Sequence, residues 1–284
     1  MRKLMEKVSK GIVKKIFRKR DRWSHKGNFG KLLIIGGSKK YSGSPALAAL
    51  AAYRVGVDLV TVASPERAAN IIASFTPDLI TYPLKGDYLN ENHLRDIFLL
   101  VENSHALVMG GGLERSEETL KTVLKILKGI SIPCVIDADA IYAVAKEKKI
   151  LRKEFVVTPH SHEFFILTGR KPSNDVKERI KLVKDVAQEL NCVILLKGNV
   201  DVISDGDEVF INETGNPYMT VGGTGDTLAG ILGALLARKV DPLSAACAAA
   251  YINGRAGDLA AKKFGEGLMA SDLLQEIPEV IKRI

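Results

Sequence analysis

The chain has 284 residues, 46% of them hydrophobic, which is enough for one large α/β domain or two small ones. No apolar run reaches the roughly 18 residues of a membrane span, and the charged N-terminus lacks the apolar core of a signal peptide. The formal net charge of +8 is misleading, because residues 1–26 carry +9 and the remaining chain about −1. We therefore expect no nucleic-acid surface, no membrane association and a cytoplasmic location.

The first 24 residues predict a basic amphipathic helix. Apolar side chains recur at steps of three and four residues, as on one face of a helix, at Met1, Leu4, Met5, Val8, Ile12, Ile16 and Phe17. We expect this helix to dock on the domain or on a second subunit. An arm that reaches a membrane surface or nucleic acid is the alternative. Residues 25–284 are predicted to form a single domain.

From residue 31 onward, short apolar runs alternate with helical patterns. Continuous apolar runs are typical of strands buried on both faces, and they occur at residues 32–35, 59–62, 106–109, 134–136, 155–157 and 193–196. Helices are predicted at 46–54, 117–127, from 163 onward, and at 228–238, 243–262 and 272–284, with a hairpin over 202–211. Such alternation without a linker predicts one doubly wound α/β domain, with a mostly parallel sheet and helices on both faces.

The three cysteines indicate a reducing compartment. Each lies inside an apolar run, and their spacing does not match a zinc site. We expect buried free thiols at Cys134, Cys192 and Cys247.

Residues 221–230 carry the strongest chemical signal. Glycines precede Asp226, and Asp226 opens an apolar run that predicts a helix. The unpaired N–H groups and the dipole at a helix start favour an anion, commonly phosphate. An acid among such glycines is suited to accept a proton during phosphoryl transfer. An aspartate cap on an ordinary buried helix is the alternative interpretation.

Polar or glycine-rich residues follow the other predicted strands as well. Sites in doubly wound sheets lie beyond the carboxyl ends of the strands, where these loops are expected to meet. Glycines at 110–112 permit close approach of a ligand to the backbone, although a plain tight turn is equally compatible. Asp137 and Asp139 are candidate magnesium ligands or, alternatively, turn and capping residues.

Two further candidates follow the next strands. His160 could hydrogen-bond a substrate amide or phosphate, although it could equally be an ordinary loop histidine. Lys197 follows five apolar residues and must either extend to solvent or pair with an anion; a nucleotide phosphate is one such partner.

With these residues laid out, residues 25–284 resemble the NAD(P)H-hydrate dehydratase family, a branch of the ribokinase-like fold. The motifs that carry the resemblance are His25-Lys26-Gly27, the glycine–serine segment 36–45, Gly110-Gly111-Gly112-Leu113, Asp137-Ala138-Asp139-Ala140, Thr158-Pro159-His160, Lys197-Gly198-Asn199, Thr214-Gly215-Asn216 and Gly222-Gly223-Thr224-Gly225-Asp226.

The resemblance implies an enzyme that repairs hydrated NADH or NADPH. It would phosphorylate the added hydroxyl with ADP or ATP and then eliminate phosphate, with Mg²⁺ as the expected metal. The implied catalytic residues are Asp226, Gly223 and Gly225, where Asp226 activates the hydroxyl and the glycine amides stabilise the transferred phosphoryl group. The implied substrate-binding residues are Ser44, Gly112, His160 and Asp226, and the implied nucleotide-binding residues are Lys197, Gly198, Asn199, Val200, Asp201 and Gly225.

Two other functions remain open on the sequence alone. A small-molecule kinase of the same fold would form a stable phosphorylated product, and a non-catalytic regulator would bind nucleotide without turnover. For the dehydratase we expect that either a separate epimerase or slow spontaneous interconversion connects the hydrate epimers. We also expect a homo-oligomer.

Overall fold

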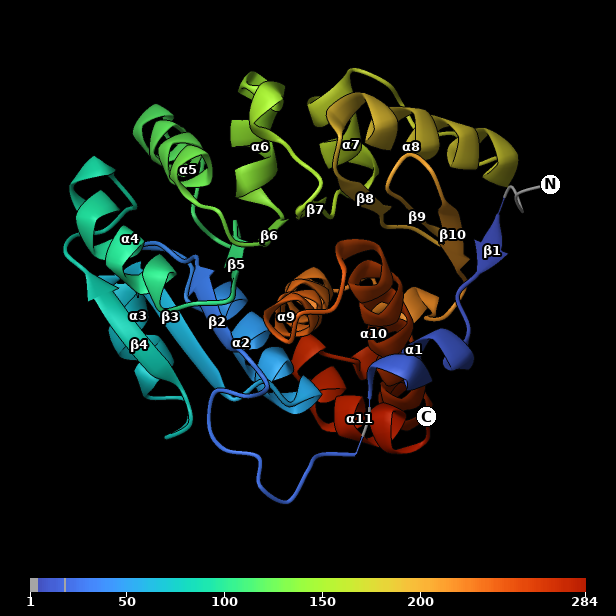
Figure 1. Cartoon of the computed structure of the whole chain (residues 1–284), viewed down its shortest axis with the longest axis horizontal. Coiled ribbons are helices and arrows are strands. Elements are labelled where there is room, and N and C mark those ends of the chain that lie inside the picture. The colour runs from blue at the N-terminus through green and yellow to red at the C-terminus, as the bar shows by residue number, and fades with distance from the viewer. Residues whose placement is uncertain (1–4, 18) are drawn as a thin grey trace.

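The computed structural model describes residues 5–17 and 19–284 and shows one sheet between two layers of helices (Figure 1). The ten strands lie in the order β1-β10-β9-β8-β7-β6-β5-β2-β3-β4. Their bounds are β1 Glu6–Lys7, β2 Lys31–Ile35, β3 Leu59–Pro65, β4 Ile80–Leu84, β5 Ala106–Met109, β6 Cys134–Ile136, β7 Phe155–Val157, β8 Val193–Leu196, β9 Asp201–Ser204 and β10 Val209–Asn212. The strands from β8 through β4 are parallel, whereas β9 is antiparallel to both neighbours. The predicted doubly wound, mostly parallel sheet is confirmed.

Helices cover both faces of this sheet (Figure 1). One layer contains α1 Lys10–Ile16, α2 Gly43–Val55, α3 Glu66–Ala73, α9 Thr224–Ala237, α10 Pro242–Phe264 and α11 Ala270–Lys282. The other contains α4 Leu94–Glu102, α5 Glu117–Gly129, α6 Asp139–Lys146, α7 Ser161–Thr168 and α8 Val176–Leu190. Short 3-10 turns lie at η1 Glu91–His93, η2 Lys148–Ile150, η3 Pro217–Met219 and η4 Gly265–Gly267.

The continuous apolar strands divide their side chains between two cores. In β2, Leu32 and Ile34 face the layer of α2 and α9, whereas Leu33 and Ile35 face the layer of α4 to α8. Successive side chains of a strand point to opposite faces, so a strand covered on both sides must be apolar at every position.

The chain reverses its direction of winding between β2 and β5. From β2 it proceeds through β3 to β4 on one side, whereas β5 pairs with the other edge of β2 and leads to β8. The connections after β2 and β5 therefore lead to helices on opposite faces of the sheet, and ligands bind at such a point in sheets of this kind. Glycines let these loops approach closely: a Cβ on Gly36 would lie 2.6 Å from the carbonyl oxygen of Gly111.

The N-terminal segment differs from the predicted single helix. Residues 6–7 form β1, which pairs in parallel with β10, and the helix α1 covers only Lys10–Ile16. Val13 is fully buried, Ile12 packs on the core, and α1 contacts α10. Helix α1 therefore docks on its own domain. The structure of Met1 and Leu4 lies outside the described residues. Residues 6–7 pair with the edge of β10 and therefore form a strand. This pairing depends on a segment far away in the chain, so the helical periodicity of the N-terminus could not predict it.

Apart from β1 and the short 3-10 turns, five elements were not predicted, namely α3, β4, α4, α6 and α8. Strand β4 is the edge of the sheet, is partly exposed and contains Pro83, so it lacks the continuous apolar run of the central strands. Helix α8 is rich in Lys and Glu on its outer face. The helix α9 begins at Thr224, four residues before the predicted start, which places Asp226 within its first turn.

Cys134, Cys192 and Cys247 are buried free thiols, as predicted, and burial raises the pKa of each. Within residues 5–17 and 19–284, no helix has the length and apolar character required to cross a membrane.

Candidate active site

Asp226 lies at the amino end of α9, where the fold gathers the glycine loops. Gly223 caps the helix with a φ of 102°, a conformation that favours glycine, and its neighbours leave no room for a Cβ. The start of α9 is fixed to α10, because the Thr227 hydroxyl lies 2.8 Å from the side-chain oxygen of Asn253 and the Asn253 amide donates to the carbonyl of Thr224. The carboxylate of Asp226 is thereby held on a rigid element.

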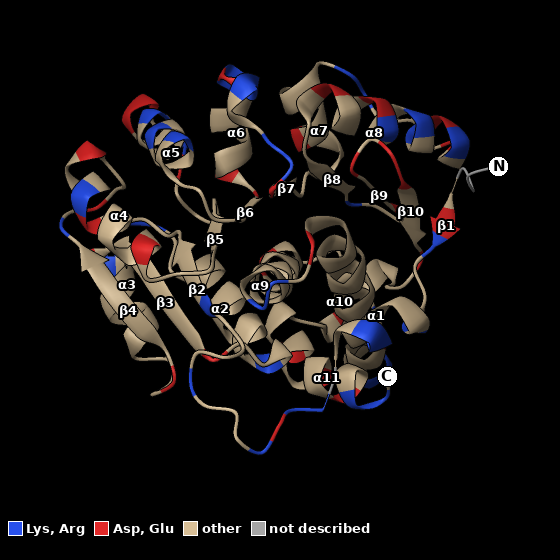
Figure 2. Cartoon of the chain, in the orientation of Figure 1, with Lys and Arg blue, Asp and Glu red and all other residues tan. Residues whose placement is uncertain are grey.

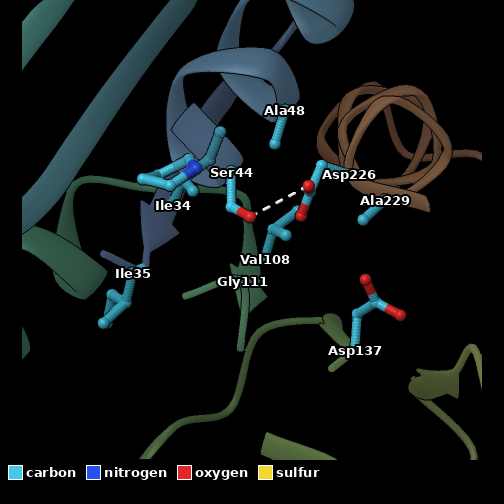
Figure 3. Close-up of a pocket in the computed structure, with 11 residues that line it drawn as sticks. Ile34, Ile35, Ser44, Ala48, Val108, Gly111, Asp137, Asp226 and Ala229 are labelled. Atoms are coloured by element: carbon cyan, nitrogen blue, oxygen red, sulfur yellow. Dashed lines mark hydrogen bonds between the residues drawn. The ribbon is translucent and has the colours of Figure 1, made fainter. Parts of the chain in front are cut away.

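A small pocket lies between α9, α2 and the loop after β5 (Figure 3). Ser44, from the first turn of α2, donates a 2.9 Å hydrogen bond to Oδ2 of Asp226. Gly111 lies on the other side of this carboxylate, since a Cβ there would be 2.9 Å from Oδ1 of Asp226 and 3.1 Å from Cβ of Ser44. Asp137 also lines the pocket, so Ser44, Gly111, Asp137 and Asp226 converge although they come from four separate elements.

The surroundings of Asp226 favour its role as a base. Burial raises the pKa of Asp226 to about 6, and the negative charge of Asp137 acts in the same direction. The hydrogen bond from Ser44 and the positive charge of Lys197 oppose this rise. A carboxylate with such a pKa is ionised at neutral pH yet is a stronger proton acceptor than an ordinary aspartate.

Lys197 is a cation beside this pocket. Its ammonium group donates to Oδ1 of Asp137 at 2.9 Å and lies 3.8 Å from Oε2 of Glu163. Burial lowers the pKa of Lys197, but the charges of Asp137 and Glu163 outweigh burial and the net shift is upward. The same ammonium group reaches the start of α9, because a Cβ on Gly225 would lie 3.5 Å from it. A charged lysine therefore stands beside the helix end that favours an anion.

His160 occupies the amino end of α7 and caps that helix. Its Nδ1 accepts hydrogen bonds from the backbone N–H groups of His162 and Glu163, while the Glu163 carboxylate accepts from the N–H of His160. Partial burial lowers the pKa of His160, although Glu163 opposes this shift. About half of the side chain remains exposed (53%), so His160 presents a neutral imidazole at the rim of the site.

The segment 197–201 follows β8, and we call it the nucleotide loop because the sequence predicts that it binds nucleotide. Gly198 and Asn199 are exposed, and Val200 is half-buried. Oδ1 of Asp201 accepts a 2.9 Å hydrogen bond from the N–H of Gly198, which closes the loop on itself. From α8, the buried Arg179 donates to the carbonyl of Lys197 at 2.9 Å, and a Cβ on Gly198 would collide with its guanidinium.

The two magnesium candidates do not face the same site. Asp137 faces the pocket and accepts hydrogen bonds from Lys197 and Thr158. Asp139 accepts from Nε of Arg115 at 2.6 Å and from the N–H of Glu114. Among the described residues, no group of three or more His, Cys, Asp or Glu side chains could hold a metal ion. Mg²⁺ commonly binds through one or two carboxylates and substrate phosphates, an arrangement that Asp137 alone could support.

The structure brings several of the predicted site residues together around Asp226. Ser44, Asp137 and Asp226 line the pocket, and Lys197 contacts Asp137 and lies beside Gly225. A Cβ on Gly112 would lie 2.7 Å from Cβ of Tyr41, whereas a Cβ on Gly111 would lie 2.9 Å from Oδ1 of Asp226, so Gly111 is the glycine that approaches Asp226. Charged residues are frequent along α8, whereas α9 carries none besides Asp226 (Figure 2).

Sequence reasoning missed Arg179, Asn253 and the contact of Gly111. Arg179 occupies an apolar position in the pattern formed by Val176, Ile180 and Val183, and an arginine on the buried face of a helix is a detectable signal. The partner of Asn253 depends on how α9 and α10 pack, which the local sequence does not indicate.

A family model described as NAD(P)H-hydrate dehydratase matches residues 32–279. The chain belongs to this family. It is 39% identical over 277 residues to the ADP-dependent (S)-NAD(P)H-hydrate dehydratase of Cenarchaeum symbiosum, covering 97% of this chain and 96% of that protein. The predicted ribokinase-like fold is confirmed as well.

Two further proteins define the extent of the similarity. The chain is 45% identical over 262 residues to the bifunctional NAD(P)H-hydrate repair enzyme Nnr of Pyrobaculum aerophilum, covering 92% of this chain and 52% of the relative. It therefore spans about half the length of the first curated relatives it matches. It also matches the solved ADP/ATP-dependent NAD(P)H-hydrate dehydratase of Bacillus subtilis, co-crystallised with ATP/Mg²⁺, with a TM-score of 0.83, 28% identity and 98% coverage of each chain.

Proposed function

We propose that this protein dehydrates the S epimer of NADH hydrate or NADPH hydrate, with ADP or ATP as the phosphoryl donor. The observation that carries the proposal is the buried carboxylate of Asp226, held by Ser44 at the amino end of α9 within a pocket of the dehydratase fold. The relatives support the substrate and the donor, since they are named for the (S) hydrate and for ADP, and the Bacillus subtilis protein for both nucleotides.

In the first step, Asp226 accepts the proton of the hydroxyl that hydration has added to the nicotinamide ring. The hydroxyl oxygen then attacks the terminal phosphorus of the nucleotide. A bond forms between this oxygen and phosphorus, and the bond to the nucleotide breaks, which releases AMP from ADP or ADP from ATP. The N–H groups at the start of α9, around Gly223 and Gly225, would stabilise the negative charge on the phosphoryl group in transit.

In the second step, phosphate leaves the ring with its bonding electron pair. Loss of a proton from the adjacent ring carbon re-forms the double bond and gives NADH or NADPH. Phosphorylation promotes this elimination because phosphate is a far better leaving group than hydroxide. The pocket of Ser44 and Gly111 would orient the ring, and Gly112 and His160 would bind the remainder of the hydrate.

The nucleotide loop, residues 197–201, would bind the adenine nucleotide together with Gly225. The ammonium group of Lys197 lies beside the start of α9, where it would attract the phosphates. Mg²⁺, when bound, would neutralise phosphate charge, and Asp137 is the carboxylate suited to hold it because Asp137 lines the pocket, whereas Asp139 does not.

Three further parts of the proposal concern the cellular context. An NAD(P)H-hydrate epimerase would supply the S epimer, the protein would act as a homo-oligomer, and it would reside in the cytoplasm. The three buried free thiols support a reducing compartment.

The identity of the products tests this function. Purified protein is incubated with NADH hydrate, Mg²⁺ and ADP, and phosphorus NMR follows the reaction. We expect free phosphate and AMP to appear in equal amounts with NADH. Accumulation of a stable phosphate ester, without NADH, would assign the protein to the kinases of this fold.

A further inference from the structure

A continuous chain of hydrogen bonds leads from the nucleotide loop to the segment after β10. Asp201 and Asn212 stand directly opposite each other in the antiparallel pair of β9 and β10. The side-chain amide of Asn212 donates to Oδ2 of Asp201 at 3.0 Å, while Oδ1 of Asp201 accepts from the N–H of Gly198. The hydroxyl of Thr214 donates to Oδ1 of Asn212 at 2.9 Å. Four residues from three segments are thus joined in one polar chain.

The far end of this chain is fixed by α10. A Cβ on Gly254 would lie 2.2 Å from the hydroxyl oxygen of Thr214 and 2.6 Å from its carbonyl oxygen, so the absence of a side chain lets the helix seat Thr214. The same hydroxyl lies 3.4 Å from the carbonyl of Tyr251. Asn212 is only 1% exposed, so water cannot replace its partners. The polar chain therefore has a rigid anchor.

We propose that Thr214 and Asn212 are positioning residues for nucleotide binding, which act through Asp201 to hold the nucleotide loop in its binding conformation. This inference rests on the proposed function, because it assumes that residues 197–201 bind the adenine nucleotide. Neither Thr214 nor Asn212 belongs to that loop. The inference gives the Thr214-Gly215-Asn216 motif a role that the chemistry at Asp226 does not use.

The physical reason is the cost of ordering an exposed loop. Gly198 and Asn199 are exposed, and glycine has more conformational freedom to lose than any other residue. A loop already held by Asp201 loses less freedom when nucleotide binds, so its affinity is higher. Asp201 can hold the N–H of Gly198 only while its own side chain is oriented, and Asn212 provides that orientation.

The experiment removes one hydroxyl at the far end of the chain. Thr214→Val keeps the shape of the side chain but leaves Asn212 without its donor. We expect the dissociation constant for ADP, measured by calorimetry, to rise about tenfold, which corresponds to the loss of about one hydrogen bond. The KM for the hydrate and the pH midpoint of turnover should remain those of the wild type. Thr214→Ser, which restores the hydroxyl, should recover most of the affinity.

Two comparisons separate positioning from general damage. Thr122→Val removes a buried hydroxyl that donates to a backbone carbonyl within α5, away from the loop, and should leave ADP affinity unchanged. Asn212→Ala removes the hydrogen bond from Asn212 to Asp201 itself, so it should weaken ADP binding at least as much as Thr214→Val.

The outcomes also separate this inference from the proposed function. Wild-type ADP affinity in Thr214→Val, or an equal loss for ADP and the hydrate, would overturn the positioning role and leave the dehydratase intact. A wild-type protein that binds neither ADP nor ATP would overturn both.

Discussion

Ser44 and Asp226 are joined by a 2.9 Å hydrogen bond although 182 residues separate them in the chain. The bond engages Oδ2 of Asp226, while Oδ1 faces the backbone of Gly111. Oδ2 is thus held by the hydroxyl of Ser44, and Oδ1 is directed at the loop after β5 that contains Gly111. This division favours Oδ1 as the atom that accepts the substrate proton.

Replacing Asp226 by Asn should remove turnover while the fold and nucleotide binding persist. We expect activity to fall on the order of a thousandfold, the usual contribution of a general base. The folded-state pKa of Asp226 is raised to about 6, so its contribution to stability is present below the unfolded value and is lost as pH rises through 6. The free energy of unfolding of the variant should therefore exceed that of the wild type by up to about 3 kcal/mol at about pH 8. Near-normal activity would remove Asp226 from the mechanism.

The pH dependence of turnover follows from the same group. Because the ionised carboxylate is the base, kcat/KM should rise with pH, about tenfold per pH unit below 6, and level off above it. Initial rates between about pH 5 and 8 measure this directly. A rate that falls as pH rises through this range would indicate that another group limits the reaction.

Gly111→Ala should impair the site without unfolding the protein. The added methyl group would press on Oδ1 of Asp226 and on Ser44, so we expect kcat to fall about a hundredfold, in line with a displacement of about 1 Å. The matched control is Gly267→Ala, where nothing lies within 4 Å of the new Cβ. Equal activities in the two variants would show that the contact with Gly111 is not required.

Lys197→Met tests the charge beside the pocket. The positive charge of Lys197 lowers the pKa of Asp226, so its removal should move the rise in the pH profile to higher pH. The variant also leaves the buried carboxylates of Asp137 and Glu163 without their cation, which costs about 3 kcal/mol of stability. The exposed Lys181→Met is the matched control. An unshifted profile in a folded Lys197 variant would contradict this electrostatic role.

The sequence predicted those features that depend on local pattern. The central strands are apolar at every position because both faces are covered, and the glycines before Asp226 indicated the start of α9. Features set by packing between distant segments were not predictable in this way. Arg179 below the nucleotide loop, Asn253 against the start of α9, and the capture of residues 6–7 by β10 each depend on neighbours far away in the chain.

The most direct test of the dehydratase assignment is the near-ultraviolet absorbance of reduced nicotinamide after mixing the protein with NADH hydrate, Mg²⁺ and either ADP or ATP. We predict that absorbance rises with at least one nucleotide, and that Asp226→Asn shows no comparable rise although it binds the same nucleotide. No rise with either nucleotide, in wild-type protein that demonstrably binds them, would contradict the assignment.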